Sequence, residues 1–194
     1  MKRNLKNDVK TILLTEEQIK QRVKELAKQI DDYYGEMPGR LVLLCVLKGS
    51  VVFMADLMKA VNIPVDIEFM KVSSYGAGTT SSGNIKIHLD LQREDLDNCN
   101  ILIVEDIIDS GRTLSRLSEY LNFKGARSVR TCTLLDKPER REVDFQADYV
   151  GFTIPDEFVI GYGLDYNEAY RELPFVGVLS PSVYTNNSEE KDEK

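Results

Sequence analysis

The sequence predicts an α/β fold with a mostly parallel, twisted sheet flanked by helices, and three observations predict it. Leu41–Leu47 is an unbroken apolar run, which is typical of a strand buried on both faces, and Ile101–Val104 and Val129–Leu135 are predicted to be two further buried strands. Segments with helical periodicity separate these strands, and strands that alternate with helices favour a parallel sheet. Polar residues follow the strands directly, at the strand ends where open α/β sheets bind their ligands.

Helices are predicted on both sides of the first apolar run. Thr15 and Gln18 have the spacing of a capping box, which marks the start of a helix. Apolar residues then recur at helical spacing, and they are Ile19, Val23, Leu26, Ala27 and Ile30. Gly35 is expected to end this helix, and Val51–Val61 is the helix predicted after the strand.

The next segment predicts a β-arm. Val65–Val72 alternates apolar and polar residues, as a half-covered strand does, and Ile85–Leu89 is expected to return beside it. Ser73–Asn84 lies between them and is polar and rich in glycine and serine. Loops of this length are uncommon in compact domains unless they are functional. The arm is therefore a candidate for a mobile functional loop.

The rest of the chain completes one domain. Thr113–Phe123 is predicted to be the helix between the second and third buried strands. Short strands are expected at Val150–Phe152, Phe158–Ile160 and Val176–Leu179. Residues 1–180 are predicted to form a single domain, because no internal repeat divides them. Residues 181–194 are polar and are expected to form a disordered tail.

The composition argues against nucleic-acid and membrane partners. The 194 residues include 25 Lys plus Arg and 32 Asp plus Glu, giving a net charge of -7, and an acidic chain is a poor binder of polyanions. The sequence has no apolar run long enough to cross a membrane and no signal-peptide core. Cys45, Cys99 and Cys132 lack metal-binding spacing and are expected to be buried thiols. A cytoplasmic location follows from these features.

The segment 101–113, ILIVEDIIDSGRT, carries the most chemical information. It predicts a strand, a tight loop and a helix start, so backbone N–H groups of the loop and of the first helical turn can converge on an anion. Gly111 permits close approach of the backbone, and the hydroxyls of Ser110 and Thr113 add donors. A phosphate monoester suits this loop.

The paired carboxylates of Glu105 and Asp106 predict a second ligand beside the phosphate. Their negative charge repels a phosphate but suits sugar hydroxyls or Mg²⁺, which prefers oxygen ligands. Alternatively, the pair is a solvated strand end and Asp109 is a helix cap, which explains single residues but not the whole segment. A phosphate loop beside hydroxyl-binding carboxylates indicates a phosphorylated ribose.

This segment resembles the phosphoribosyl pyrophosphate signature of type I phosphoribosyltransferases, and its Glu-Asp pair resembles the hypoxanthine–guanine branch. The resemblance covers residues 10 to 180 and implies the family fold, with a flexible loop on the β-arm and a small hood lobe. It implies that residues 109–113 hold the 5′-phosphate, with Arg112 at a variable position of this loop. Glu105 and Asp106 are expected to face the ribose hydroxyls and one Mg²⁺, and Asp109 to act as general base on purine N7.

The same resemblance implies a pyrophosphate subsite. Lys48 and Gly49 directly follow the first apolar run, and in the family this loop binds pyrophosphate, often through a cis peptide before the lysine. We therefore expect a cis bond between Leu47 and Lys48. Arg171 is expected to meet the pyrophosphate as well, since a guanidinium fork suits phosphate oxygens.

A purine subsite is implied by the two segments around Lys137 and residues 154–171. Lys137 is expected to donate to the purine O6, and an ammonium, which has only donors, disfavours the amino group of adenine. Phe158 would stack on the base, and the backbone of Val159 would read its edge. Asp165 would hold a second Mg²⁺ and approach the 2-position of the base.

The resemblance also places Ser74 and Tyr75 on the flexible loop, closing over the reacting centre to exclude water. The implied enzyme transfers a phosphoribosyl group to hypoxanthine or guanine, forming IMP or GMP and pyrophosphate, and works as a homodimer or homotetramer. Three alternatives stay open: a xanthine-preferring transferase, a non-catalytic sensor of phosphoribosyl pyrophosphate or nucleotides with the same fold, and a plain Rossmann-like binding protein. The chain lacks the glycine fingerprints of dinucleotide and P-loop sites, which argues against the third.

Overall fold

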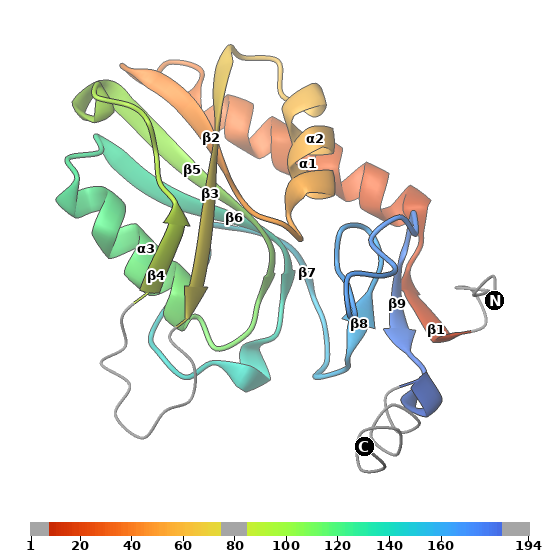
Figure 1. Ribbon diagram of the computed structural model, residues 1–194. Coiled ribbons are helices and arrows are strands. Elements are labelled where there is room, and N and C mark those ends of the chain that lie inside the picture. Colours follow the sequence, from red (N-terminus) through yellow and green to blue (C-terminus); the bar gives the residue numbers. More distant parts are fainter. Residues whose placement is uncertain (1–7, 75–84, 184–194) are drawn as a thin grey trace.

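A computed structural model describes residues 8–74 and 85–183, and it contains two sheets (Figure 1). The larger sheet has six strands in the order β4-β3-β2-β5-β6-β7. Their bounds are Ile85–Leu89 (β4), Val65–Ser74 (β3), Arg40–Val46 (β2), Cys99–Ile108 (β5), Ser128–Asp136 (β6) and Tyr149–Thr153 (β7). Every neighbouring pair is parallel except β3 and β4. The predicted mostly parallel α/β sheet is therefore confirmed.

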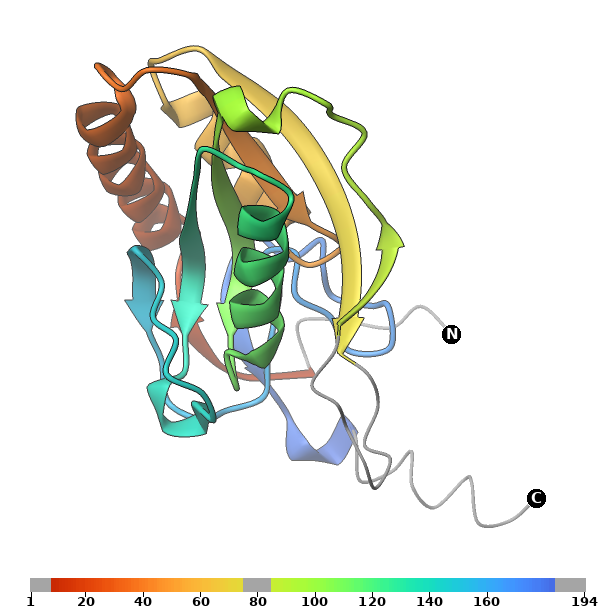
Figure 2. The same cartoon turned by 90° about the vertical axis from the view of Figure 1, so that its left-hand side faces the viewer.

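Helices cover both faces of this sheet, as Figure 2 shows. Helices α1 (Glu16–Tyr34) and α2 (Val51–Ala60) pack on one face and bury Ile19, Leu26 and Phe53 against β2 and β6. Helix α3 (Arg112–Phe123) packs on the other face through Leu114, Leu117 and Leu121. The central strands β2 and β5 are buried on both sides, which explains why they lack an alternating pattern.

The capping signals of α1 are confirmed at its start. The Thr15 hydroxyl accepts from the backbone N–H of Gln18, and the Gln18 side chain accepts from the N–H of Thr15, so both halves of the capping box are present. The helix ends at Gly35 as expected, but Gly35 has φ −56° and is right-handed. A glycine is needed at position 35 for steric reasons, because a Cβ at this position would lie 2.8 Å from the carbonyl oxygen of Asp31.

A smaller antiparallel sheet forms a separate lobe beside the large sheet, in the order β1-β9-β8 (Figure 1). Its strands are Val9–Leu14 (β1), Val176–Leu179 (β9) and Val159–Ile160 (β8). Strand β1 was not among the predicted elements, because only Leu14 of its six residues is fully buried and its sequence has no clear alternation. The lobe has its own apolar cluster around Ile160, Tyr170 and Leu179.

Three predicted boundaries need correction. Strand β5 continues to Ile108 rather than ending at Val104, because Glu105, Ile107 and Ile108 still pair with β6. Phe158 lies just before β8 and not within it. The predicted tail begins with an ordered helical turn at residues 181–183, where the N–H of Val183 donates to the Ser180 carbonyl. Residues 75–84, which hold most of the predicted loop, and residues 184–194 lie outside the described ranges.

Candidate active site

Two adjoining cavities open at the carboxyl end of the large sheet. The first, of about 360 Å³, lies between the β2–α2 loop and the β5–α3 loop, and its lining includes residues 46–49, 72–73, 105–111 and 113–114. The second, of about 450 Å³, is lined by Ile107, Asp109, Lys137, Arg140, Asp156, Phe158, Val159 and Leu164. Ile107 and Asp109 line both cavities. The expected phosphate and purine residues therefore face a common centre at Asp109.

The β5–α3 loop forms the floor of the first cavity. Gly111 is the N-cap of α3 and has φ +79°, a left-handed conformation that glycine adopts without strain. The hydroxyl of Ser110 accepts from the backbone N–H of Arg112 at 3.4 Å, and Thr113 lines the cavity. The first N–H groups of α3 thus begin beside the cavity, which gives the loop the anion-binding character expected of it.

Arg112 contributes to this loop through its backbone. Its side chain forms an ion pair with Glu142, with Nε 2.6 Å from the carboxylate, and it does not line the first cavity. The guanidinium of Arg112 is therefore engaged with Glu142 and not with the cavity.

The acidic pair lies inside the first cavity, on a strand rather than on a solvated end. Burial raises the pKa of Glu105 well above its ordinary value, with Asp106 adding repulsion, and one oxygen of Glu105 is buried without a hydrogen-bond partner. Burial also raises the pKa of Asp106 to about 6. A buried carboxylate with an unsatisfied oxygen is a costly arrangement, which a bound hydroxyl or cation would relieve.

The β2–α2 loop brings Lys48 and Gly49 against this pair. The peptide bond between Leu47 and Lys48 is cis, as expected. A Cβ on Gly49 would lie 1.5 Å from a carboxylate oxygen of Asp106, and a Cβ on Gly163 would lie 2.0 Å from the Gly49 carbonyl oxygen. Only glycines allow this approach, so the loop is fixed between strand β5 and the segment that follows β8.

Arg171 reaches the same region from the smaller lobe. Its guanidinium donates to the Gly163 carbonyl at 2.7 Å and lies 2.8 Å from a carboxylate oxygen of Asp165. The second oxygen of Asp165 accepts from the backbone N–H of Glu168. Asp165 therefore lies next to the expected pyrophosphate residues, and both of its oxygens are engaged within the protein.

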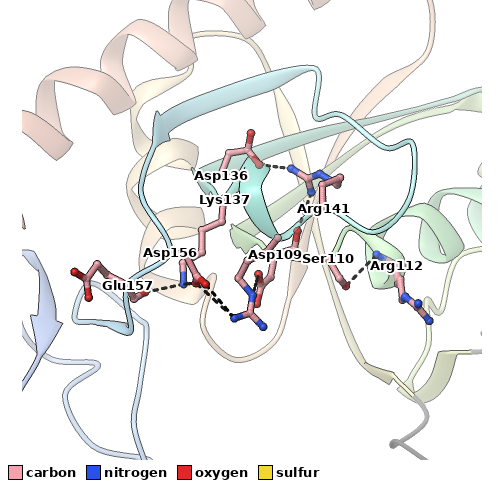
Figure 3. Close-up of polar contacts among 9 residues, drawn as sticks. Asp109, Ser110, Arg112, Asp136, Lys137, Arg141, Asp156 and Glu157 are labelled. Atoms are coloured by element: carbon pink, nitrogen blue, oxygen red, sulfur yellow. Dashed lines mark hydrogen bonds and ion pairs between the residues drawn. The ribbon is translucent and has the colours of Figure 1, made fainter. Parts of the chain in front are cut away.

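Lys137 lines the second cavity with an almost fully buried side chain. Its ammonium donates to the Glu157 carbonyl at 2.7 Å and lies 3.5 Å from Asp156 (Figure 3). Phe158 is 48% exposed beside it and meets the Tyr166 ring edge-on at 5.6 Å between centroids, while Val159 is buried. An aromatic face and a cation that line the same cavity suit a flat base with a carbonyl group.

Sequence reasoning missed the charged residues that hold Asp109. Arg140 Nε lies 2.6 Å from its carboxylate, and Arg141 donates to its carbonyl at 3.3 Å while also pairing with Asp136 (Figure 3). The N–H of Glu142 donates to the Ser110 carbonyl. The only signal for these contacts is the charged run of residues 138–142 directly after Lys137, PERRE.

Most of the expected site residues are thus brought together. Ser74 ends β3, paired with Ile85 across the arm, and Tyr75 lies outside the described residues. Within residues 8–74 and 85–183, no three acidic, histidine or cysteine side chains converge as a metal site. In the same ranges, no helix has the length and apolar character needed to cross a membrane.

Comparisons with known proteins agree with this geometry. Residues 10–167 match the family described as the phosphoribosyl transferase domain. The chain is 49% identical to hypoxanthine-guanine phosphoribosyltransferase of Bacillus subtilis, covering 93% of this chain and 98% of that protein. A solved hypoxanthine phosphoribosyltransferase from Staphylococcus aureus has a TM-score of 0.88 and 47% identity, covering 95% of this chain and 98% of that one.

The chain also matches part of larger proteins. It is 46% identical to the bifunctional protein TilS/HprT of Listeria monocytogenes over 94% of its own length, but it spans only 28% of that protein. The matched region is therefore one part of that relative, whereas the match to the Bacillus subtilis protein extends over nearly the whole of both chains. The family match covers most of the chain, and these relatives share nearly half of its residues. The chain therefore belongs to the hypoxanthine–guanine phosphoribosyltransferase family.

Proposed function

We propose that the protein transfers the 5-phosphoribosyl group of phosphoribosyl pyrophosphate to hypoxanthine or guanine, forming IMP or GMP and pyrophosphate in purine salvage. The observation that carries this proposal is the position of Asp109, which lines both the cavity of the phosphate loop and the cavity of Lys137 and Phe158. A base in the second cavity and a ribose in the first would therefore meet at this carboxylate.

The phosphoribosyl half is held by the first cavity. Residues 109–113 present the start of α3 to the 5′-phosphate, and Gly111 lets the phosphate approach the backbone. Glu105 and Asp106 accept hydrogen bonds from the 2′- and 3′-hydroxyls of the ribose. Lys48, Gly49 and Arg171 bind the pyrophosphate, which leaves as a polyanion and needs cations around it.

The acidic pair fits a magnesium ion. Glu105 has an unsatisfied buried oxygen, Asp106 lies beside it, and both carboxyl groups have raised pKa values because they are buried, so a divalent cation would relieve both charges. Phosphate oxygens of the substrate would complete the coordination, since Mg²⁺ in such sites is usually held by one or two carboxylates. When bound, Mg²⁺ would neutralise negative charge on the departing pyrophosphate. Asp165 is the candidate ligand for a second ion.

The base is oriented by the second cavity. Lys137 donates to O6, Phe158 stacks on the ring, and the Val159 backbone reads the edge of the base. The ammonium of Lys137 is already held by the Glu157 carbonyl, so it is directed before the base arrives. Asp165 approaches the 2-position, and N9 of the base then faces the anomeric carbon.

Asp109 is proposed to take the proton from N7 as N9 forms its bond to the ribose. Its carboxylate pairs with Arg140 in the structure, and Arg140 is also close to Asp156. Both charges are half-exposed, so this pair is weak and the carboxylate can turn to the base. Ser74 and Tyr75 remain the candidates for closing the site against water.

The test is a set of initial rates with phosphoribosyl pyrophosphate, Mg²⁺ and five bases: hypoxanthine, guanine, xanthine, adenine and uracil. We expect turnover of the first two, none of the last two, and a large loss in Asp109→Asn. Fast turnover of xanthine in preference to the others would replace the proposal with the xanthine-specific alternative. No turnover of any base, with phosphoribosyl pyrophosphate still bound, would leave a non-catalytic sensor as the function.

A cytoplasmic location and a homodimeric or homotetrameric assembly belong to the same proposal. The net charge of -7 supports small anionic and neutral ligands in a local site rather than nucleic acid. Sedimentation at two protein concentrations measures the assembly state, and a monomer at both would remove the expected oligomer.

A further inference from the structure

Glu168 lies on a tight turn that directs it toward the proposed pyrophosphate residues. Asn167 and Glu168 have φ values of 51° and 62°, and Tyr166 and Ala169 form an isolated antiparallel bridge around them. Two consecutive left-handed residues are typical of a type I′ turn. The backbone N–H of Glu168 donates to Asp165 at 2.9 Å. The backbone of Glu168 therefore stabilises the turn, and its side chain is not needed for this contact.

The carboxylate of Glu168 joins two cations that come from different parts of the chain. Both of its oxygens accept from Lys48 Nζ at 3.0 Å, although the two residues are 120 positions apart. One of them also accepts from Arg171 at 3.4 Å. Lys48 and, to a lesser degree, Arg171 hold the pKa of Glu168 below its ordinary value. This carboxylate therefore lies where two cations converge.

A carboxylate between a lysine and an arginine makes contacts like those of a phosphate group, because both present acceptor oxygens to the same donors. We propose that Glu168 is an internal competitor of pyrophosphate, whose carboxylate must leave Lys48 and Arg171 before phosphate oxygens bind them. It thereby weakens the binding of pyrophosphate and promotes its departure. This inference rests on the proposed function, since it takes Lys48 and Arg171 as the pyrophosphate cations.

Exposure makes the exchange feasible. The side chain of Glu168 is 66% exposed and that of Lys48 52% exposed, so both can separate into water. Arg171 stays in place without Glu168, because Gly163 and Asp165 also hold it. Exposed ion pairs are weak, and their usual strength corresponds to an affinity change of about two- to fivefold.

The test compares Glu168→Gln with wild type by calorimetric titration of pyrophosphate in the presence of Mg²⁺. Glutamine keeps the size of the side chain and the backbone of the turn but removes the charge. We expect pyrophosphate to bind about two- to fivefold more tightly, and to inhibit the forward reaction at correspondingly lower concentration, while IMP affinity is unchanged.

Glu172→Gln is the matched control. Glu172 is exposed and follows Arg171 directly. Its substitution removes the same charge near the site but keeps the contact between Glu168 and Lys48. A clearly smaller effect in Glu172→Gln supports a contact competitor. An equal gain in both variants overturns the inference, because it would show a general effect of charge.

Two further outcomes distinguish failure of this inference from failure of the proposed function. Unchanged or weaker pyrophosphate binding in Glu168→Gln, with a wild-type enzyme that turns over hypoxanthine, overturns this inference alone. A wild-type protein that neither binds pyrophosphate nor turns over any base overturns the proposed function and the inference together. Thermal melting of each variant checks the fold, and an exposed substitution on this turn is expected to change it little.

Discussion

Because the carboxylate of Asp106 is largely removed from solvent, we expect this proposed ribose-binding residue to destabilise the folded protein. The substitution that tests this is Asp106→Asn, which keeps the shape of the side chain and removes its charge. Asp106 lies in the first cavity against Gly49, where a Cβ would be 1.5 Å from its oxygen, so its carboxylate is reached by solvent only in part. We expect the variant to be more stable than wild type at neutral pH and nearly inactive.

The magnitude follows from the pKa. Burial raises the pKa of Asp106 from 3.8 to about 6, and this difference corresponds to about 3 kcal/mol of unfolding free energy. An asparagine amide that finds no partner beside Gly49 costs about 1–3 kcal/mol. We therefore expect a net gain of about 0–2 kcal/mol, which raises the Tm of a chain of this size by up to about 8 °C.

The sign of the pH dependence can be stated separately. Because the pKa of Asp106 is higher in the folded protein, its contribution favours folding below about pH 4 and is lost as the pH rises through about 6. Wild type should lose stability across this window relative to the variant. The stability difference, Asp106→Asn minus wild type, should therefore increase by up to about 3 kcal/mol between pH 4 and pH 7.

Denaturant unfolding of both proteins between pH 4 and pH 8 measures this difference. Glu119→Gln serves as the control, because Glu119 is an exposed carboxylate, 60% exposed and paired with Arg116 on α3, and it should show little pH-dependent difference in this window. A stability difference for Asp106→Asn that is flat with pH, or that falls as pH rises, would refute the reasoning. Phosphoribosyl pyrophosphate with Mg²⁺ should stabilise wild type more than the variant.

Three further predictions concern activity. Asp109→Asn should lower kcat by about 10²- to 10⁴-fold, because the proposed general base is lost, and change the KM for phosphoribosyl pyrophosphate much less; an unchanged kcat in steady-state kinetics would contradict this. Lys137→Gln should lower kcat/KM for hypoxanthine by about 10- to 100-fold and raise the adenine-to-hypoxanthine ratio, since an amide can accept from an amino group; competition between the two bases measures it. Gly49→Ala should reduce kcat/KM for phosphoribosyl pyrophosphate by about 100-fold, because the new Cβ displaces Asp106, and near-normal kinetics would show that the loop can shift at little cost.

Predictions from the sequence were most successful where a feature depends on a short stretch of chain. The strands β2, β5 and β6 and the helices α1, α2 and α3 were predicted because their apolar spacing reflects the face that each one buries. The strand, loop and helix start at residues 101–113 were predicted for the same reason, since they are contiguous in the sequence. Strand β1 was missed because its burial comes from pairing with the distant β9.

The candidate site was predicted from its strand exits and from family resemblance rather than from contacts. The structure places Lys48, the acidic pair and Asp109 around one cavity, and Lys137 and Phe158 around the next. It also adds residues that no local pattern marks. Arg140 reaches Asp109 from the segment after β6, and Asp156 approaches the cations of Lys137 and Arg140 from another segment.

The sequence by itself determined the α/β class, the parallel strands and the loop at the start of α3, because hydrophobic periodicity and small-residue turns are local properties. Only the tertiary structure decided that Asp106 is buried against Gly49 and that Glu168 lies between Lys48 and Arg171. Those contacts join segments far apart in the chain, and their geometry depends on the order of the strands and the packing of the smaller lobe. Charge and burial at such contacts set pKa values and affinities, so these properties follow from the assembled fold.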